Sequence, residues 1–188
     1  MQTQAADCSI VEDSSLIIYN AMRDLDNCIV VSNGKQTDTI CDELEDGKNF
    51  YTALRSEKHE PDHPNYTPRI SGIIKRLEGS MSLSIISKSD FSVEHSEFRL
   101  YSYTDIAPGY GYCLTTYMSD SKPLLSFKGS PLIVPLQGNA EQIANYYWLG
   151  LNQDNRISLA VREISQTGED RLKIINRNKV KSKNYQPL

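Results

Sequence analysis

Short apolar runs rich in β-branched residues recur along the chain, and helical periodicity interrupts them in only two places. Because strands follow one another in runs and do not alternate strictly with helices, the pattern predicts an α+β fold with antiparallel strands. The expected helices cover 38–57, with a break at Gly47, and 139–152. The expected strands lie within 15–23, 27–34, 80–90, 97–105, 107–120, 130–136, 156–164 and 171–176, with a hairpin at each end of this series.

The residues that begin the two predicted helices suit capping. Asp38 is expected to be the N-cap of the first helix and Asn139 that of the second, with Glu141 in its first turn. After the first helix, the segment KHEPDHPNYTPR (58–69) has three prolines in twelve residues. Proline restricts φ and removes an N–H donor, so this segment is expected to be an irregular loop.

Length and charge limit the classes of protein to consider. The 188 residues fit a single domain, assigned to 1–180, followed by a C-terminal tail, 181–188. The formal net charge of −4 and the scattered Lys and Arg argue against a nucleic-acid interface. No apolar stretch approaches the ~20 residues of a membrane span, and the first residues lack the features of a signal peptide. The expected location is cytoplasmic, where cysteines are reduced thiols. The four cysteines are Cys8, Cys28, Cys41 and Cys113.

A polar run follows the Asn33-Gly34 pair, where a second apolar strand would be expected after a hairpin turn. One interpretation is structural, because Asn and Thr often serve in turns and helix caps. The other is that a strand ends, the backbone turns at Gly34, and the start of the next helix offers its N–H groups to an anion. The local sequence leaves both interpretations open. The run consists of Gln36, Thr37, Asp38 and Thr39.

The proline-rich segment concentrates groups that could bind or transfer protons. A carboxylate beside a guanidinium provides a proton-transfer group and an anion clamp, and prolines hold such a loop in place at low entropic cost. The alternative is a rigid surface connector whose charges face water. The polar side chains concerned are Glu60, Asp62, Asn65, Thr67 and Arg69.

Three other sets of residues carry less weight as site candidates. His59, Asp62 and His63 suggest a metal site, but the prolines between them prevent the helical spacing that such sites use. Tyr112 and Tyr117 could stack on a planar base, or they could be half-buried strand aromatics. Cys113 has no basic neighbour in the sequence to lower the pKa of its thiol, so it is not expected to be a nucleophile.

Taken together, several stretches resemble one known family, in order and over nearly all of residues 1–180. They are LIIYNAMR, VVSNGKQTDTI, HEPDHPNYTPRISGI, PGYGYCLTTY with PLLSFKGSP, and NQDNRISLAVREI with KIINRNK. The sequence is similar to archaeal-type IMP cyclohydrolases and their bacterial relatives, and the patterns SNGxxTDTI and NxTPRI are the most specific. Members of that family begin with a few dozen further residues, including a GR near the start and an Arg- and Ser-rich segment. The resemblance therefore implies that this chain is N-terminally incomplete. Some relatives also have a histidine where this chain has Tyr112.

The resemblance implies a fold and an activity. The fold is a four-layer αββα sandwich like that of N-terminal-nucleophile hydrolases, without an amino-terminal nucleophile. The activity is closure of 5-formamidoimidazole-4-carboxamide ribotide to IMP with loss of water in purine synthesis, catalysed by a hydrolase that acts on C–N bonds of cyclic amidines. No metal or organic cofactor is implied, and the expected partners are the ribotide and IMP, with no nucleic acid or membrane. A homo-oligomer is compatible with the sequence. The alternative is a non-catalytic relative that binds purine ribotides.

The resemblance also implies a set of site residues. Glu60 would perform acid/base work, Tyr19 would contribute a hydroxyl and Arg23 a cation. Asn33, Thr37 and Asp38 would hydrogen-bond the base or its carboxamide, and Arg69 would supply positive charge near the substrate or orient Glu60. Asn65 and Thr67 complete the expected substrate-binding set.

Overall fold

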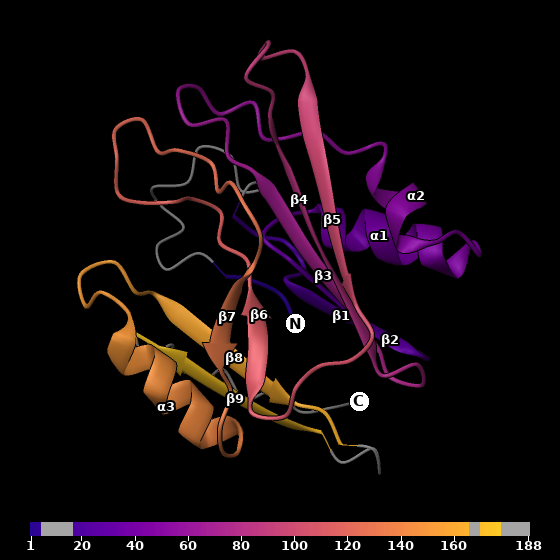
Figure 1. Cartoon of the computed structure of the whole chain (residues 1–188), viewed down its shortest axis with the longest axis vertical. Coiled ribbons are helices and arrows are strands. Elements are labelled where there is room, and N and C mark those ends of the chain that lie inside the picture. The colour runs from indigo at the N-terminus through magenta and orange to yellow at the C-terminus, as the bar shows by residue number, and fades with distance from the viewer. Residues whose placement is uncertain (5–16, 166–169, 178–188) are drawn as a thin grey trace. The chain divides into compact units, whose positions relative to one another are not determined.

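The computed structural model describes residues 1–4, 17–165 and 170–177, and it is a mixed α+β structure, as predicted (Figure 1). The described residues form two compact units, one from Met1–Ala107 and Tyr112–Val134, the other from Pro108–Gly111 and the chain from Pro135 onward. In chain order the elements are β1 (Met22–Leu25), β2 (Cys28–Ser32), α1 (Gln36–Glu45), α2 (Phe50–Leu54), β3 (Arg69–Lys75), β4 (Ser80–Lys88), β5 (Ser96–Tyr103), β6 (Tyr110–Cys113), β7 (Leu132–Pro135), α3 (Ala140–Gly150), β8 (Ser158–Glu163) and β9 (Arg171–Asn176).

The first unit contains a five-stranded antiparallel sheet with the strands in sequence order, β1-β2-β3-β4-β5. Its central strand, β3, was not predicted, and Arg69, assigned to the loop, is the first residue of that strand. Charged ends and the central Gly72 obscure the strand pattern. A Cβ at Gly72 would lie 3.1 Å from Leu83 Cδ2 and 3.2 Å from Val31 Cγ2, so side chains of both flanking strands fill the space beside this glycine.

The initial hairpin exists with different bounds from those predicted. β1 begins at Met22 and includes Asp24 and Leu25, which the sequence analysis assigned to the connection. Residues 15 and 16 of the predicted strand lie outside the described residues. Because Leu25 pairs with Cys28, only two residues form the turn, which is a common length for a β-hairpin.

Helices α1 and α2 cover one face of the five-stranded sheet (Figure 1). Ile40 and Cys41 of α1 are fully buried against this face, and the same helical stripe continues back to buried Gln36 and Thr37. The predicted break occurs at Gly47, whose φ of +81° suits glycine at a helix end. The buried stripe of α1 therefore directs the polar side chains of Gln36 and Thr37 toward the sheet instead of into solvent.

The prediction that Asp38 caps α1 is wrong. Lys35 is the N-cap residue, its side chain makes no capping hydrogen bond, and Asp38 lies within the first turn of the helix. The helix begins earlier because the backbone turns helical directly after Gly34, whose carbonyl accepts from the Thr37 N–H. The Asp38 carboxylate instead accepts from Asn20 and Arg23.

In the second unit, α3 packs against the hairpin of β8 and β9, and Lys173 of β9 forms an ion pair with Glu141 of α3. Asn139 caps α3 as predicted, because its side chain accepts from the Gln142 N–H at 3.0 Å. The Gln142 side chain accepts from the Asn139 N–H at 3.0 Å, which completes a capping box. A further two-stranded sheet pairs β6 with β7, and the residues of each strand are divided between the two units.

Replacing Asn139 by Ala should lower the free energy of unfolding by about 1 kcal/mol, because the Gln142 N–H at the start of α3 loses its acceptor. The measurement is urea denaturation followed by circular dichroism. Asn145→Ala, at an exposed position within the same helix, is the matched control and should leave stability unchanged or slightly raised. Equal losses in the two variants would contradict a specific role for the cap.

Cys28, Cys41 and Cys113 are free, as predicted, whereas Cys8 and the tail 181–188 lie outside the described residues. Burial raises the pKa of the Cys41 thiol to about 11 and also raises the pKa of the Cys113 thiol, so neither is activated for nucleophilic attack. Among the described residues, no helix is both long enough and apolar enough to cross a bilayer.

Candidate functional site

Arg69 is the centre of a buried polar cluster at the start of β3. Its side chain is only 7% exposed. Its Nε donates to the carbonyl of Lys58 at 2.7 Å, and its Nη1 donates to Gln36 Oε1 at 2.8 Å. The same Nη1 lies 2.9 Å from Glu60 Oε1. The guanidinium is therefore held on two sides while it forms a direct ion pair with the predicted acid/base residue.

Gln36 connects this ion pair to the turn after β2. Its side chain has no exposed surface, and its Nε2 donates to Asn33 Oδ1 at 3.0 Å and to the carbonyl of Ile70 at 3.3 Å. A Cβ at Gly34 would lie 2.6 Å from Gln36 Oε1 and 3.1 Å from Arg69 Nη1. The glycine of the SNG sequence thus allows the backbone to approach the Gln36–Arg69 pair closely.

Glu60 has the properties of a proton donor. Its side chain is 16% exposed. Burial raises the pKa of its carboxyl group, the nearby Arg69 opposes that change, and the negative charges of Asp62 and Glu57 add to it. A carboxyl group with a raised pKa retains its proton closer to neutral pH, as general acids in enzymes do.

The Tyr19 hydroxyl belongs to the same neighbourhood. Burial raises the pKa of Tyr19, and the negative charge of Glu60 raises it further. A raised pKa keeps the phenol protonated at neutral pH, so it can donate a hydrogen bond. Within the described residues, the Tyr19 hydroxyl makes no hydrogen bond. Glu60 and Arg69 are in direct contact, and the charge of Glu60 acts on the Tyr19 hydroxyl.

Asn33 is close to this group, but its own hydrogen-bonding capacity is used within the protein. Its Nδ2 donates to the carbonyl of Pro68 at 2.9 Å and to Thr116 Oγ1 at 3.5 Å. Its Oδ1 accepts from Gln36 and, at 2.9 Å, from the N–H of Ile70. These contacts favour a supporting role, in which Asn33 holds the end of β2 against the start of β3.

Thr37 is also placed as a supporting residue. It is fully buried, and its hydroxyl lies 2.5 Å from Ser32 Oγ and 3.3 Å from the carbonyl oxygen of Gly34. A side chain without exposed surface cannot contact a ligand in this conformation. Its contact with Ser32 anchors the first turn of α1 to the end of β2.

Arg23 and Asp38 form a separate charged cluster beside α1. Arg23 Nη1 lies 3.1 Å from Asp38 Oδ1 and 2.9 Å from Asp42 Oδ1, while Arg23 Nη2 lies 3.8 Å from Glu45. Asn20 Nδ2 donates to both carboxylate oxygens of Asp38, at 2.9 and 3.2 Å. Arg23 is thus neutralised by acids of one helix face, and within the described part of the chain it contacts neither Glu60 nor Arg69. Its predicted catalytic role stays a prediction.

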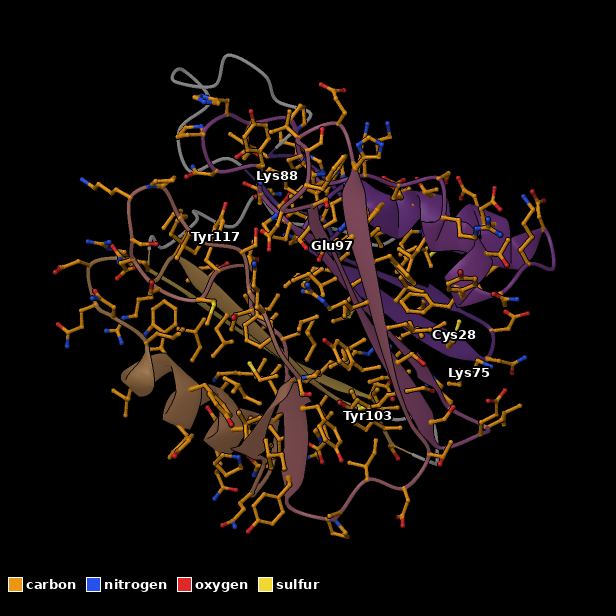
Figure 2. The ribbon with its side chains drawn as sticks, turned by 45° about the horizontal axis from the view of Figure 1, so that its top comes forward. Cys28, Lys75, Lys88, Glu97, Tyr103 and Tyr117 are labelled. Carbon is orange, nitrogen blue, oxygen red and sulfur yellow. The ribbon has the colours of Figure 1, made fainter. Side chains whose placement is uncertain are left out.

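The proline-rich loop closes on itself through Thr67. Asp62 accepts from the Thr67 N–H at 2.7 Å and from its hydroxyl at 2.5 Å, while the Glu60 N–H donates to the Thr67 carbonyl at 2.9 Å. Thr67 Oγ1 also lies 2.5 Å from the hydroxyl of Tyr117, which is on the segment between β6 and β7 (Figure 2). The loop therefore holds Glu60 at a defined position.

A second contact fastens the same loop to the segment between β6 and β7. Asn65 Oδ1 accepts from the N–H of Leu124 at 3.2 Å. Together with the Thr67–Tyr117 contact, this accounts for both remaining predicted substrate-binding residues. Each holds the loop in place, and any contact that they make with a ligand stays a prediction.

The histidines and the remaining tyrosine of interest have partners within the protein. His59 is 8% exposed, its Nδ1 lies 2.8 Å from Ser96 Oγ, and burial lowers the pKa of its imidazole. The His63 ring packs edge-on against Tyr66, and Tyr112 stacks on Tyr103 with ring centroids 3.6 Å apart, which supports the interpretation as a packed aromatic. Over 1–4, 17–165 and 170–177, no three His, Cys, Asp or Glu side chains are grouped so as to bind a metal ion.

Two residues of the cluster were not predicted as site residues. Gln36 belongs to the polar run after Gly34, and its place on the buried stripe of α1 could have identified it as a member of the cluster. The second residue is Glu57. Its Oε2 lies 3.6 Å from Arg69 Nε, and its side chain is only 11% exposed. No local signal singles it out, because Glu57 is linked to Glu60 only through Arg69, which contacts both carboxylates and comes from a distant part of the sequence.

The chain is similar to known proteins over most of its length. A family model described as IMP cyclohydrolase-like protein matches residues 1–169. The IMP cyclohydrolase of Methanocaldococcus jannaschii is 29% identical over 156 residues, which make up 81% of this chain and 68% of that protein. The family match includes Arg69 and every side chain that contacts it.

Proposed function

Because this chain belongs to the IMP cyclohydrolase-like family, we propose that it closes 5-formamidoimidazole-4-carboxamide ribotide to IMP with loss of water. Family membership implies a purine ribotide as substrate and a place in purine biosynthesis. The observation that best supports catalysis is the buried ion pair of Glu60 with Arg69.

The reaction makes limited demands on the protein. The carboxamide nitrogen bonds to the formyl carbon, and the formyl oxygen leaves as water with one proton from each of the two nitrogens. Holding the two groups close and in plane is strongly rewarded in an intramolecular reaction. The protein must also stabilise the oxyanion and protonate the departing hydroxide.

In the proposed mechanism Glu60 donates the proton to the departing hydroxide. The raised pKa of its carboxyl group keeps that proton available. Tyr19 and Arg69 donate hydrogen bonds to the oxygen that gains negative charge during attack. The remaining predicted residues hold these three groups in position or contact the ribotide at a distance from the reacting atoms. They are Arg23, Asn33, Thr37, Asp38, Asn65 and Thr67.

We also propose the four-layer αββα sandwich as the complete architecture of a single domain. The face of the five-stranded sheet opposite α1 and α2 is largely apolar by register, which suits packing against a second sheet. Residues on this face include Ile29, Val31, Ile70, Ile74, Met81, Leu83 and Ile85.

The test is incubation of the purified chain with the formamido-ribotide, with IMP formation followed by absorbance and by chromatography. The chain should turn over the substrate without added metal, and Tyr19→Phe should reduce kcat by about tenfold or more, because a donor to the oxyanion is lost. Tyr51→Phe, at an exposed position on α2, is the matched control and should be unchanged. Tight binding of IMP without turnover would overturn the enzymatic proposal and support a binding protein.

A further inference from the structure

Arg69 forms ion pairs with two carboxylates. Glu60 Oε1 lies 2.9 Å from its Nη1 and Glu57 Oε2 lies 3.6 Å from its Nε. The side chains of Glu57, Glu60 and Arg69 are 11%, 16% and 7% exposed. One cation and two carboxylates are thus largely removed from water, which leaves an excess negative charge in the cluster when both acids are ionised.

Glu57 is held in place by the backbone. Its N–H donates to the carbonyl of Leu54 at the end of α2, at 3.1 Å. The carbonyl of the next residue, Lys58, accepts a hydrogen bond from Arg69 Nε at 2.7 Å. The carboxylate of Glu57 thus lies near Nε of the guanidinium, whereas that of Glu60 contacts Nη1.

We propose that Glu57 is a positioning residue that favours the protonated form of Glu60. It does so because it shares the positive charge of Arg69 and adds a second negative charge to the cluster. A guanidinium engaged by two carboxylates stabilises the anionic form of each less than it would stabilise one alone. Glu57 thereby keeps Glu60 protonated to a higher pH. The kinetic form of this inference rests on the proposed function.

Other charged groups also face Glu60 and must be considered. Asp62, on the same loop, adds negative charge, and Lys35, at the start of α1, adds positive charge. Tyr19 is neutral when protonated. Lys35 and Asp62 act in opposite directions, and neither contacts Arg69. Glu57 differs from both because it shares the cation that forms the ion pair with Glu60.

The experiment measures the pKa of Glu60 in the full chain by carboxyl ¹³C NMR after labelling with ¹³C-glutamate. Glu60→Gln identifies the signal by its loss. Glu57→Gln keeps the shape and removes the charge, so the pKa of Glu60 should fall by about 0.5 to 1 unit. An unchanged or raised pKa in this variant would overturn the proposal. Glu57→Asp should give a smaller fall and tests the same point if Glu57→Gln does not fold.

The matched control is Glu78→Gln. Glu78 forms an ion pair with Lys75, which lies at the end of β3 opposite to Arg69, far from the Lys88 and Glu97 end of the sheet (Figure 2). This variant should leave the pKa of Glu60 unchanged, and a shift equal to that of Glu57→Gln would count against a specific effect of Glu57.

Kinetics provide a second readout that separates the two proposals. In Glu57→Gln the fall of kcat/KM at high pH should begin at a lower pH, by the same interval as the NMR shift. If the unaltered chain does not turn over the ribotide, the proposed function fails, while the NMR titration still decides the role of Glu57. A merely structural role would change stability without moving either profile.

Discussion

Glu60→Gln should reduce kcat for closure of the formamido-ribotide by at least about a hundredfold, because the amide cannot donate a carboxylic proton to the departing hydroxide. Gln has nearly the same shape as Glu and can still accept a hydrogen bond from Arg69, so the loop should keep its conformation. The measurement is the initial rate of IMP formation at saturating substrate, with KM determined separately. A large loss in kcat with little change in KM is expected, because the interaction acts mainly in the transition state.

The matched control for this variant is again Glu78→Gln, which removes an exposed carboxylate and should retain full activity. A rate for Glu60→Gln above about a tenth of the unaltered rate would show that Glu60 is not the general acid. In the unaltered chain, kcat/KM should fall as the pH rises through the raised pKa of Glu60, since only the protonated form donates. That part of the profile should be absent in the variant.

The raised pKa also affects stability. A carboxyl group whose pKa is higher in the folded state binds its proton more tightly there than in the unfolded chain. Its contribution is therefore full below the unfolded pKa of about 4.3 and is lost as the pH rises through the folded pKa. Relative to the unaltered chain, Glu60→Gln should become more stable as the pH rises through this interval.

Arg69→Met should lower the free energy of unfolding by about 3–5 kcal/mol and abolish turnover. Methionine fills much of the same volume but leaves the carboxylates of Glu57 and Glu60 in a largely buried site without their cation, and breaking a buried ion pair in this way is costly. It also removes the donor to Gln36 Oε1. Urea denaturation at neutral pH is the measurement.

Two comparisons separate charge from packing in this variant. Lys75→Met breaks an exposed ion pair and should cost less than about 1 kcal/mol. Adding Glu57→Gln and Glu60→Gln to Arg69→Met should recover part of the lost stability, since no unpaired charge remains. If the triple variant were as unstable as Arg69→Met alone, lost packing around the arginine would explain the defect instead.

Much of the local structure could be predicted because it depends on residues a few positions apart. The interval between Ile40 and Leu44 identified α1, Gly47 identified its end, and Asn139 identified the start of α3. The cap of α1 could not be predicted in this way. Asp38 has the right side chain for a cap, but its carboxylate contacts Arg23 on β1, so a tertiary contact takes precedence over a local preference.

The central strand shows the same limit in the sheet. Residues 69–75 have two charged ends and a glycine, and on local preference they are weak strand formers. Their strand is stabilised from both sides by β2 and β4, whose side chains occupy the space beside Gly72. Pairing with two neighbouring strands supplies the stabilisation that the weak strand preference of this segment does not provide.

The sequence by itself determined the α+β class and the helix ends around Gly47 and Asn139, because these depend on neighbouring residues, and its motifs carried the resemblance to the IMP cyclohydrolase-like family. Only the tertiary structure decided which polar groups hold the fold and which are grouped around Glu60. The partners of Asn33 include Pro68 and Thr116, 35 and 83 positions away, and those of Arg69 include Gln36, 33 positions away. A hydrogen bond requires contact within about 3 Å, and only the folded chain brings such distant residues that close.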